Sequence, residues 1–222
     1  MLVISSTLLL VACNKGMNEE QWNAAMDALV NCDVVTISYH QEKSTNARTT
    51  KTYDDRTLRY DLTNGKLYAE QTVKRYNMFD VLIDQTSKYQ YVEVNDLELI
   101  KYIKNIVDNR PTSWSSNKQT CNSNEEAKQR LKQVFESYFI EYGLNDFNYS
   151  DFSYKKGKYV KSSVVNENNA TWQLTFDKGK FTKANYETKH KWGSSSIDYD
   201  KISIVIEYSV DISTPSDLPP IV

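Results

Sequence analysis

Three glycine-containing turns constrain the fold of this chain most strongly. Gly65, Gly157 and Gly179 each lie beside an Asn or Lys residue, and alternating apolar and polar residues flank each of them. Glycine adopts the positive φ that a tight turn requires, and Asn-Gly between alternating residues is a strong hairpin signal. The chain has only six glycines and four prolines but sixteen tyrosines, which favours regular β-structure over disorder. The sequence therefore predicts several antiparallel hairpins.

The Asn64-Gly65 turn also predicts a register. A two-residue loop would set Leu62 opposite Leu67 and Tyr60 opposite Ala69, so that both apolar pairs share one face. Lys156-Gly157 and Lys178-Gly179 predict hairpins of the same kind. Further strands are predicted over residues 34–39, 74–83, 89–94, 184–191 and 201–212, and residues 112–122 are predicted to be irregular.

Three helices are predicted from capping signals followed by apolar residues at helical spacing. Asn18 with Gln21 begins the first, and Asn95 with Glu98 begins the second, which continues to residue 107. Ser123 begins the third and longest helix. Its apolar face comprises Ala127, Leu131, Val134, Phe135, Tyr138, Phe139 and Tyr142, and Gly143 suits a left-handed C-terminal cap.

The N-terminus carries an export signal. Residues 2–12 form an apolar run that is too short to span a membrane as a helix but is typical of a secretory signal. Leu10-Val11-Ala12-Cys13 resembles the bacterial lipobox, and this resemblance implies that Cys13 carries fatty acyl chains such as palmitate and becomes the first mature residue. No Lys or Arg precedes the run, which a start codon assigned too late would explain. The alternative is a buried N-terminal strand with an incidental cysteine.

The order of elements resembles the LolA/LppX-type lipoprotein fold. The matching pieces are the first helix with Trp22, the hairpin at residues 64–68, the pair of segments 152–154 and 176–180, and the closing strand at 208–215. The resemblance implies an unclosed barrel that wraps around helices and carries lipid in an apolar cavity between them. It transfers no ligand-contact residue, because the chain contains no ligand-specific motif.

These observations predict an α+β fold in which a curved antiparallel β-sheet, an unclosed half-barrel, packs on about three α-helices. Residues 1–12 are expected to be a signal peptide and residues 13–18 a lipidated tether. A single α+β domain is expected over 19–215, followed by a flexible tail over 216–222.

No catalytic motif is found in the sequence, so the chain is predicted not to be an enzyme and to need no cofactor. His40 and His190 are isolated, and no set of residues has the spacing of a zinc site. The net charge of −2 gives no general affinity for nucleic acid. Cys32 and Cys121 either pair in a disulfide or remain as two separate buried thiols.

The predicted location is the extracytoplasmic face of the cell membrane or outer envelope, with the membrane contacted through the acyl chains. The first functional hypothesis is a non-catalytic binding module for a hydrophobic or amphipathic ligand such as a lipid. The alternative is an envelope-associated structural or interaction lipoprotein with a solid core and no small-molecule ligand. Lysines at the hairpin tips either contact anionic lipid or envelope polymer, or serve solubility and edge protection. They are Lys155, Lys156, Lys158, Lys178 and Lys180.

Overall fold

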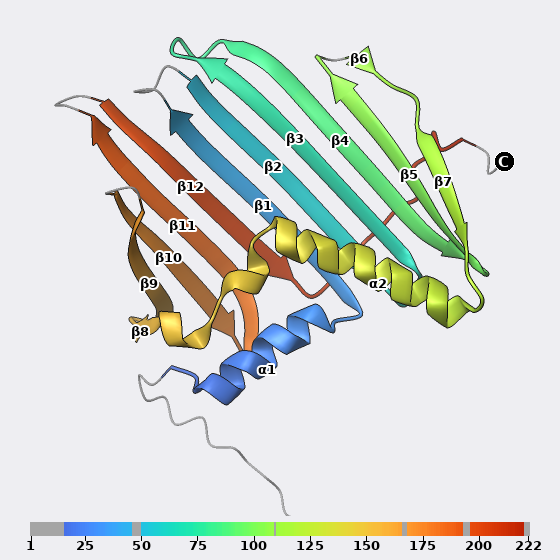
Figure 1. The fold of residues 1–222 in the computed structure, drawn as a ribbon, viewed down its shortest axis with the longest axis horizontal. Coiled ribbons are helices and arrows are strands. Elements are labelled where there is room, and N and C mark those ends of the chain that lie inside the picture. The colour runs from blue at the N-terminus through green and yellow to red at the C-terminus, as the bar shows by residue number, and fades with distance from the viewer. Residues whose placement is uncertain (1–15, 46–49, 109, 166–167, 193–195, 220–222) are drawn as a thin grey trace, which may run out of the picture.

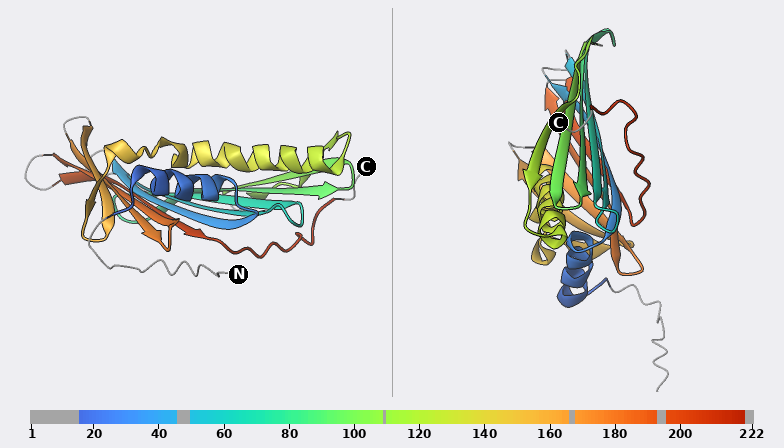
Figure 2. Two further views of the ribbon diagram at one scale, coloured as in Figure 1. Left: turned by 90° about the horizontal axis from the view of Figure 1, so that it is seen from below. Right: turned by 90° about the vertical axis from the view of Figure 1, so that its right-hand side faces the viewer.

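The computed structural model describes residues 16–45, 50–108, 110–165, 168–192 and 196–219. Twelve strands form one antiparallel sheet, and both α-helices cross one face of it (Figure 1). The chain after the last strand, residues 208–219, runs along the opposite face (Figure 2). The fold therefore has a helix layer, a sheet, and a single extended segment behind the sheet.

The sheet order is β6-β5-β4-β3-β2-β1-β12-β11-β10-β9-β8, and β7 also pairs with β5. The N-terminal half contributes β1 (Val34–Thr45), β2 (Thr50–Asp61), β3 (Lys66–Asn77), β4 (Leu82–Asn95), β5 (Glu98–Val107), β6 (Arg110–Pro111) and β7 (Ser115–Thr120). The C-terminal half contributes β8 (Ser153–Lys155), β9 (Lys158–Val165), β10 (Asn168–Asp177), β11 (Lys180–Trp192) and β12 (Ser196–Glu207). The helices are α1 (Glu19–Val30) and α2 (Asn124–Glu141), followed by short 3-10 turns at Leu144–Asp146 and Tyr149–Asp151.

One pair of strands joins the two halves. β1 and β12 run antiparallel, with Ile37 opposite Ile206 and Tyr39 opposite Ile204. These side chains are buried on the helix-bearing face. Because this pair joins strands from the two ends of the chain, two consecutive meanders become one continuous sheet.

Both helices begin as the sequence predicts. The Asn18 side chain accepts a hydrogen bond from the Gln21 amide at 2.8 Å, and the Gln21 side chain accepts one from the Asn18 amide at 3.0 Å. At the start of α2, the Ser123 hydroxyl accepts from the Glu126 amide at 3.1 Å. The predicted apolar face of α2 is confirmed, since its buried members are Ala127, Leu131, Phe135 and Phe139. Gly143 has φ 66°, the predicted left-handed cap.

The prediction of an α+β fold with about three helices is wrong. The described residues contain two α-helices and are mainly β-structure. The segment predicted as the second helix is strand β5, and Asp96-Leu97 is the loop of a hairpin that pairs Asn95 with Glu98. Asp96 has φ 52°, which fits this tight turn.

The error has a physical cause, because β5 is buried on both faces. Leu99 belongs to the large core under the helices. Ile100 and Tyr102 form a second core with Tyr91 on the other face, against which Ile212 and Leu218 of the C-terminal segment pack. A strand with two apolar faces lacks strict alternation, and its apolar residues then also match helical spacing.

The lysine hairpins are confirmed. Lys155 pairs with Lys158 and Asp177 with Lys180, so each loop contains two residues. All four loop residues have positive φ, between 49° and 80°, as a type I′ turn requires.

The predicted register at Asn64-Gly65 is wrong by two residues. Tyr60 lies opposite Leu67, and the loop contains four residues, 62–65. Asp61 explains the longer loop, because its carboxylate accepts hydrogen bonds from the Asn64 amide at 2.9 Å and from the Asn64 side chain at 2.7 Å. A shift of two residues keeps the same side chains on the same face.

Other predicted bounds also change. The strand predicted at 74–83 is interrupted by a turn at residues 78–81, the last strand ends at Glu207, and the stretch 112–122 contains strand β7. Residues 216–219, predicted to belong to a flexible tail, are held on the sheet. Asp217 accepts a hydrogen bond from Lys104 at 2.6 Å, and Leu218 packs on the second core.

Candidate functional site

Cys13, the predicted acylation site, lies outside the described residues. The chain is fixed to the fold shortly after it, because the hydroxyls of Tyr149 and Tyr159 both donate to the Met17 carbonyl at 3.2 Å. Trp22 then packs on Tyr159 and Phe176, with ring centroids 5.0 and 4.8 Å apart. Acyl chains on Cys13 would therefore sit four residues from a fixed point.

The strand ends form two opposite edges of the sheet, with hairpin tips along each. The lysine-rich hairpin tips lie at the same one of these edges as α1 (Figure 1). All five lysines named from the sequence are exposed. Two of them also contact neighbouring side chains: Lys158 donates to Gln173 at 3.3 Å, and the Lys180 ammonium lies 4.5 Å from the centre of the Tyr208 ring. The start of α1 and a group of exposed lysines therefore lie at the same edge of the sheet.

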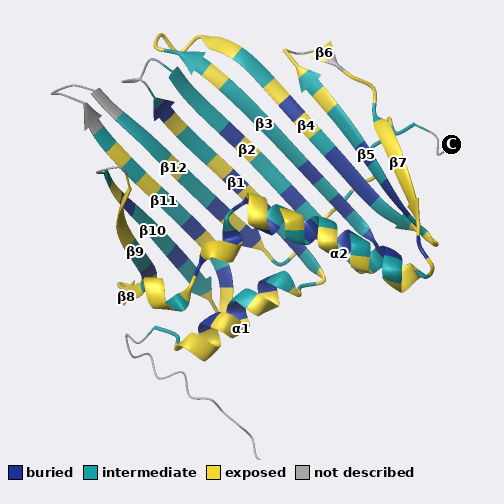
Figure 3. Ribbon diagram, in the orientation of Figure 1, coloured by how far each residue is buried: buried dark blue, intermediate teal, exposed yellow. Residues whose placement is uncertain are grey.

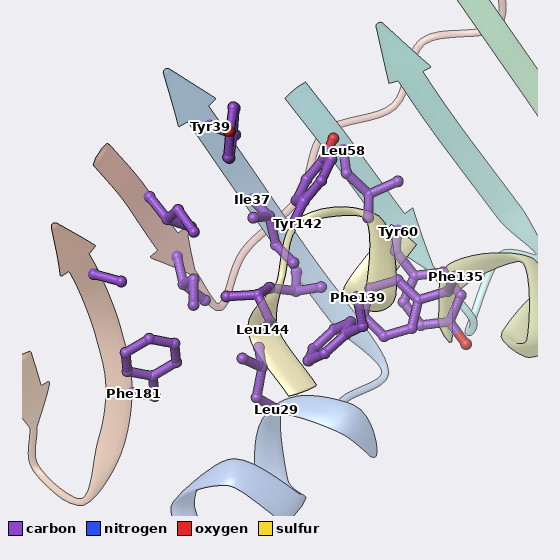
Figure 4. Close-up of a cluster of buried hydrophobic side chains, with 14 of the residues drawn as sticks. Leu29, Ile37, Tyr39, Leu58, Tyr60, Phe135, Phe139, Tyr142, Leu144 and Phe181 are labelled. Carbon is purple, nitrogen blue, oxygen red and sulfur yellow. The ribbon is translucent and has the colours of Figure 1, made fainter. Parts of the chain in front are cut away.

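The space between the helices and the sheet is filled. Figure 4 shows side chains of α1, α2, β1 and β2 pointing toward one another, including Leu29, Ile37 and Leu58. Phe135 stacks on Tyr60 with ring centroids 4.1 Å apart. Between α2 and the sheet, the hollow beside Tyr138 and Tyr142 measures about 30 Å³. This is room for one or two water molecules.

A charged network borders this core at the end of α2. Arg56 donates to both oxygens of Asp54 through Nε at 3.1 Å and to Glu141 through Nη1 at 2.9 Å. Gln71 donates to the same Asp54 carboxylate at 3.1 Å. The Arg56 guanidinium also lies 4.8 Å from the centre of the Tyr39 ring. Burial raises the pKa of the Tyr39 hydroxyl to about 12. The charged groups of this network therefore pair with one another at the margin of the hydrophobic core.

The helix-bearing face is left uncovered at the upper ends of the strands, where Figure 3 shows mostly intermediate and exposed residues. An open hollow of about 500 Å³ there is lined largely by polar side chains, among them Lys43, Thr45, Thr188 and Asp200. Asp200 is already engaged, since it accepts a hydrogen bond from Gln41 at 2.8 Å. Because this hollow is open to solvent, it would leave an apolar ligand largely in contact with water, unlike an enclosed cavity.

One arrangement resembles the beginning of a hydrolytic site. Asp55, His40 and Ser203 lie directly opposite one another on the adjacent strands β2, β1 and β12. His40 Nδ1 lies 2.6 Å from Asp55 Oδ1, but both side chains are half exposed. The Ser203 hydroxyl donates instead to Asn185 at 3.2 Å. The serine is therefore held by the amide of Asn185 rather than activated by the histidine, as nucleophilic catalysis would require.

A run of exposed apolar side chains, the longest in the part of the chain that the structure describes, was missed by the sequence analysis. It is the apolar tip of the β3–β4 hairpin, which lies at the edge of the sheet opposite α1 (Figure 1). We define the apolar tip as Met78, Phe79, Val81, Leu82 and Ile83, which are 61%, 75%, 57%, 44% and 57% exposed. Asn77 and Asp80, two residues typical of turns, are the sequence signal that could have identified this hairpin.

The other predicted site residues are not brought together. Cys32 and Cys121 are both free thiols, and burial raises the pKa of Cys32 to about 11. Cys32 donates to the Leu29 carbonyl after α1, whereas Cys121 is buried just before α2. His190 contacts Asn168. Among the residues that the structure describes, no group of three or more His, Cys, Asp or Glu side chains could hold a metal ion.

Comparisons with known proteins give no relative. No family model matches the chain, and no curated protein matches it. Within the described ranges, neither α-helix has the length and apolar character needed to cross a membrane.

Proposed function

We propose that this chain is a membrane-anchored extracytoplasmic lipoprotein that acts through contacts at its surface, without catalysis and without carrying a small molecule. The observation that carries this proposal is the filled space between helices and sheet. A pocket for a small ligand usually measures 300–1,000 Å³. The hollow under α2 is about one tenth of the lower limit.

The anchor is supported by the sequence and by the position of the lysines. Cys13 follows an apolar run and a small residue, as in a lipobox. The exposed lysines of the β8–β9 and β10–β11 hairpins lie at the edge where the N-terminal segment enters the fold. Cations near an anionic leaflet are each attracted by about 1 kcal/mol. An acyl anchor at this edge would therefore bring these lysines to the headgroups of the same membrane.

A Cys13→Ala variant tests the anchor. Two acyl chains hold a protein stably on a bilayer, so the wild-type protein should remain with membranes that have been washed with alkaline carbonate. The Cys13→Ala variant should appear in the wash, because without acyl chains it is a peripheral protein, which alkaline carbonate releases. Cell fractionation followed by immunoblotting measures this distribution.

Cys32→Ala is the matched control, because it also removes a thiol but leaves residue 13 intact. It should stay with the washed membranes like the wild type. Retention of Cys13→Ala at the wild-type level would refute the anchor.

A further inference from the structure

We propose that the apolar tip of the β3–β4 hairpin inserts into a lipid bilayer. This inference rests on the surface-contact function proposed above and names the partner of that contact, a bilayer other than the one that the lysines at the opposite edge of the sheet would face. Three features of the described residues support a bilayer rather than a protein groove: the distribution of the apolar side chains, the hydrogen bonding of the turn, and the pairing of the nearby charges.

The apolar side chains continue around the hairpin end. Met78, Phe79 and Val81 lie in the turn, and Leu82 and Ile83 follow at the start of β4, where a bulge leaves Ile83 without a partner residue on β3. Leu82 and Ile83 are both exposed, and Phe79 at the turn is the most exposed large apolar side chain of the described chain. A protein groove would cover one face of such a hairpin and leave the other in water. A bilayer surrounds an inserted tip on all sides.

Four backbone amides at the turn donate hydrogen bonds within the turn itself. The Phe79 and Val81 amides donate to the Asn77 side-chain oxygen at 2.9 and 3.1 Å, and the Asp80 amide donates to the Asn77 carbonyl at 3.1 Å. The Asn77 amide in turn donates to the Val81 carbonyl at 3.0 Å. An unpaired backbone group is strongly unfavourable in lipid. Asn77 thus lowers the number of backbone donors in the turn that would lose hydrogen bonds on leaving water.

The charges beside the tip are paired. Asp80 accepts a hydrogen bond from Lys51 at 2.5 Å, and this bond raises the pKa of Lys51. Asp84 accepts from Arg75 Nε at 2.9 Å through both of its oxygens. Each acid next to the apolar side chains therefore has a cationic partner on a neighbouring strand, which lowers the cost of bringing it to the headgroup region.

The tip and α1 lie at opposite edges of the sheet, so insertion of the tip does not need acyl chains on Cys13. The test therefore uses the Cys13→Ala protein beginning at residue 13, because the apolar run at residues 2–12 would itself bind vesicles. Its binding to phosphatidylcholine vesicles, with and without phosphatidylglycerol, is measured by vesicle flotation. Phe79→Ser in the same background should lower the partition coefficient at least about tenfold, because the phenyl ring no longer leaves water.

Val164→Ser is the matched control, since Val164 on β9 is 70% exposed but lies outside the tip. It should bind vesicles like its parent, and Leu82→Ser should repeat the loss seen with Phe79→Ser. Circular dichroism confirms that each variant is folded. The inference is overturned if the Cys13→Ala protein does not bind vesicles, if Phe79→Ser and Val164→Ser bind equally, or if the tip instead mediates self-association. Failure of the acyl anchor would be seen separately, in the carbonate wash of wild-type membranes.

Discussion

Replacing Phe135 by alanine should lower the free energy of unfolding by about 3–5 kcal/mol, the usual effect of removing a buried phenyl ring. Phe135 is fully buried, stacks on Tyr60 and meets the edge of Phe139 with ring centroids 5.2 Å apart. These neighbours come from β2 and from α2 itself, so the side chain links the helix to the sheet. Because the surroundings are closely packed, they can collapse only partly into the vacated space.

Urea denaturation followed by circular dichroism measures this loss. Ile140→Ala is the control on the same helix, because Ile140 is 69% exposed, and it should change stability by less than about 0.5 kcal/mol. A loss below about 1 kcal/mol for Phe135→Ala would mean that the interior is loosely packed, and the argument against a ligand cavity would fail with it.

Replacing Arg56 by alanine should lower the free energy of unfolding by a similar amount, about 3–5 kcal/mol, because it leaves a carboxylate buried without its cation. Asp54 is 8% exposed, and Gln71 would remain as its side-chain hydrogen-bond donor. The truncation also removes the contact between the guanidinium and the Tyr39 and Tyr142 rings. The loss is read from urea denaturation at pH 7.

The double variant Arg56→Met/Asp54→Leu separates the cost of an unpaired charge from the cost of a changed shape. Replacing both members of a buried ion pair by apolar residues is often close to neutral, so the double variant should be more stable than Arg56→Ala. A double variant that is no more stable than Arg56→Ala would argue against the charge mechanism.

Signals that act within a few residues were predictable. Asn18 with Gln21, Ser123 with Glu126, and the Lys-Gly turns each determine local geometry through neighbouring side chains or through φ, and the structure has all of them. The sequence also predicted an antiparallel sheet, which is confirmed.

Features that depend on distant partners were not predictable. β5 resembles a helix until the C-terminal segment is placed behind it, because Ile212 and Leu218 pack on its second apolar face and explain why a strand has two. The register after Tyr60 was missed although its cause is local: the Asp61 carboxylate accepts a hydrogen bond from the amide of Asn64, three residues further on, and the loop contains four residues. The pairing of β1 with β12 joins residues about 160 positions apart, and no local pattern specifies it.

The candidate surfaces were not found equally well. The lysine tips were identified because a glycine marks each turn, whereas the turn of the apolar tip contains no glycine and was read as part of one continuous strand, residues 74–83. Its turn depends on Asn77, whose side chain binds two amides that lie further along the chain. The Arg56 network was not found, because Glu141 and Gln71 come from elements far from Asp54 in the sequence.

Native mass spectrometry of the wild-type protein after mild extraction from membranes tests the central claim most directly. The account predicts a chain that begins at Cys13, carries its covalent acyl groups and retains no further small molecule. A chain that still contains residues 1–12 with an unmodified Cys13, or an acylated chain that keeps an additional lipid bound, would contradict it.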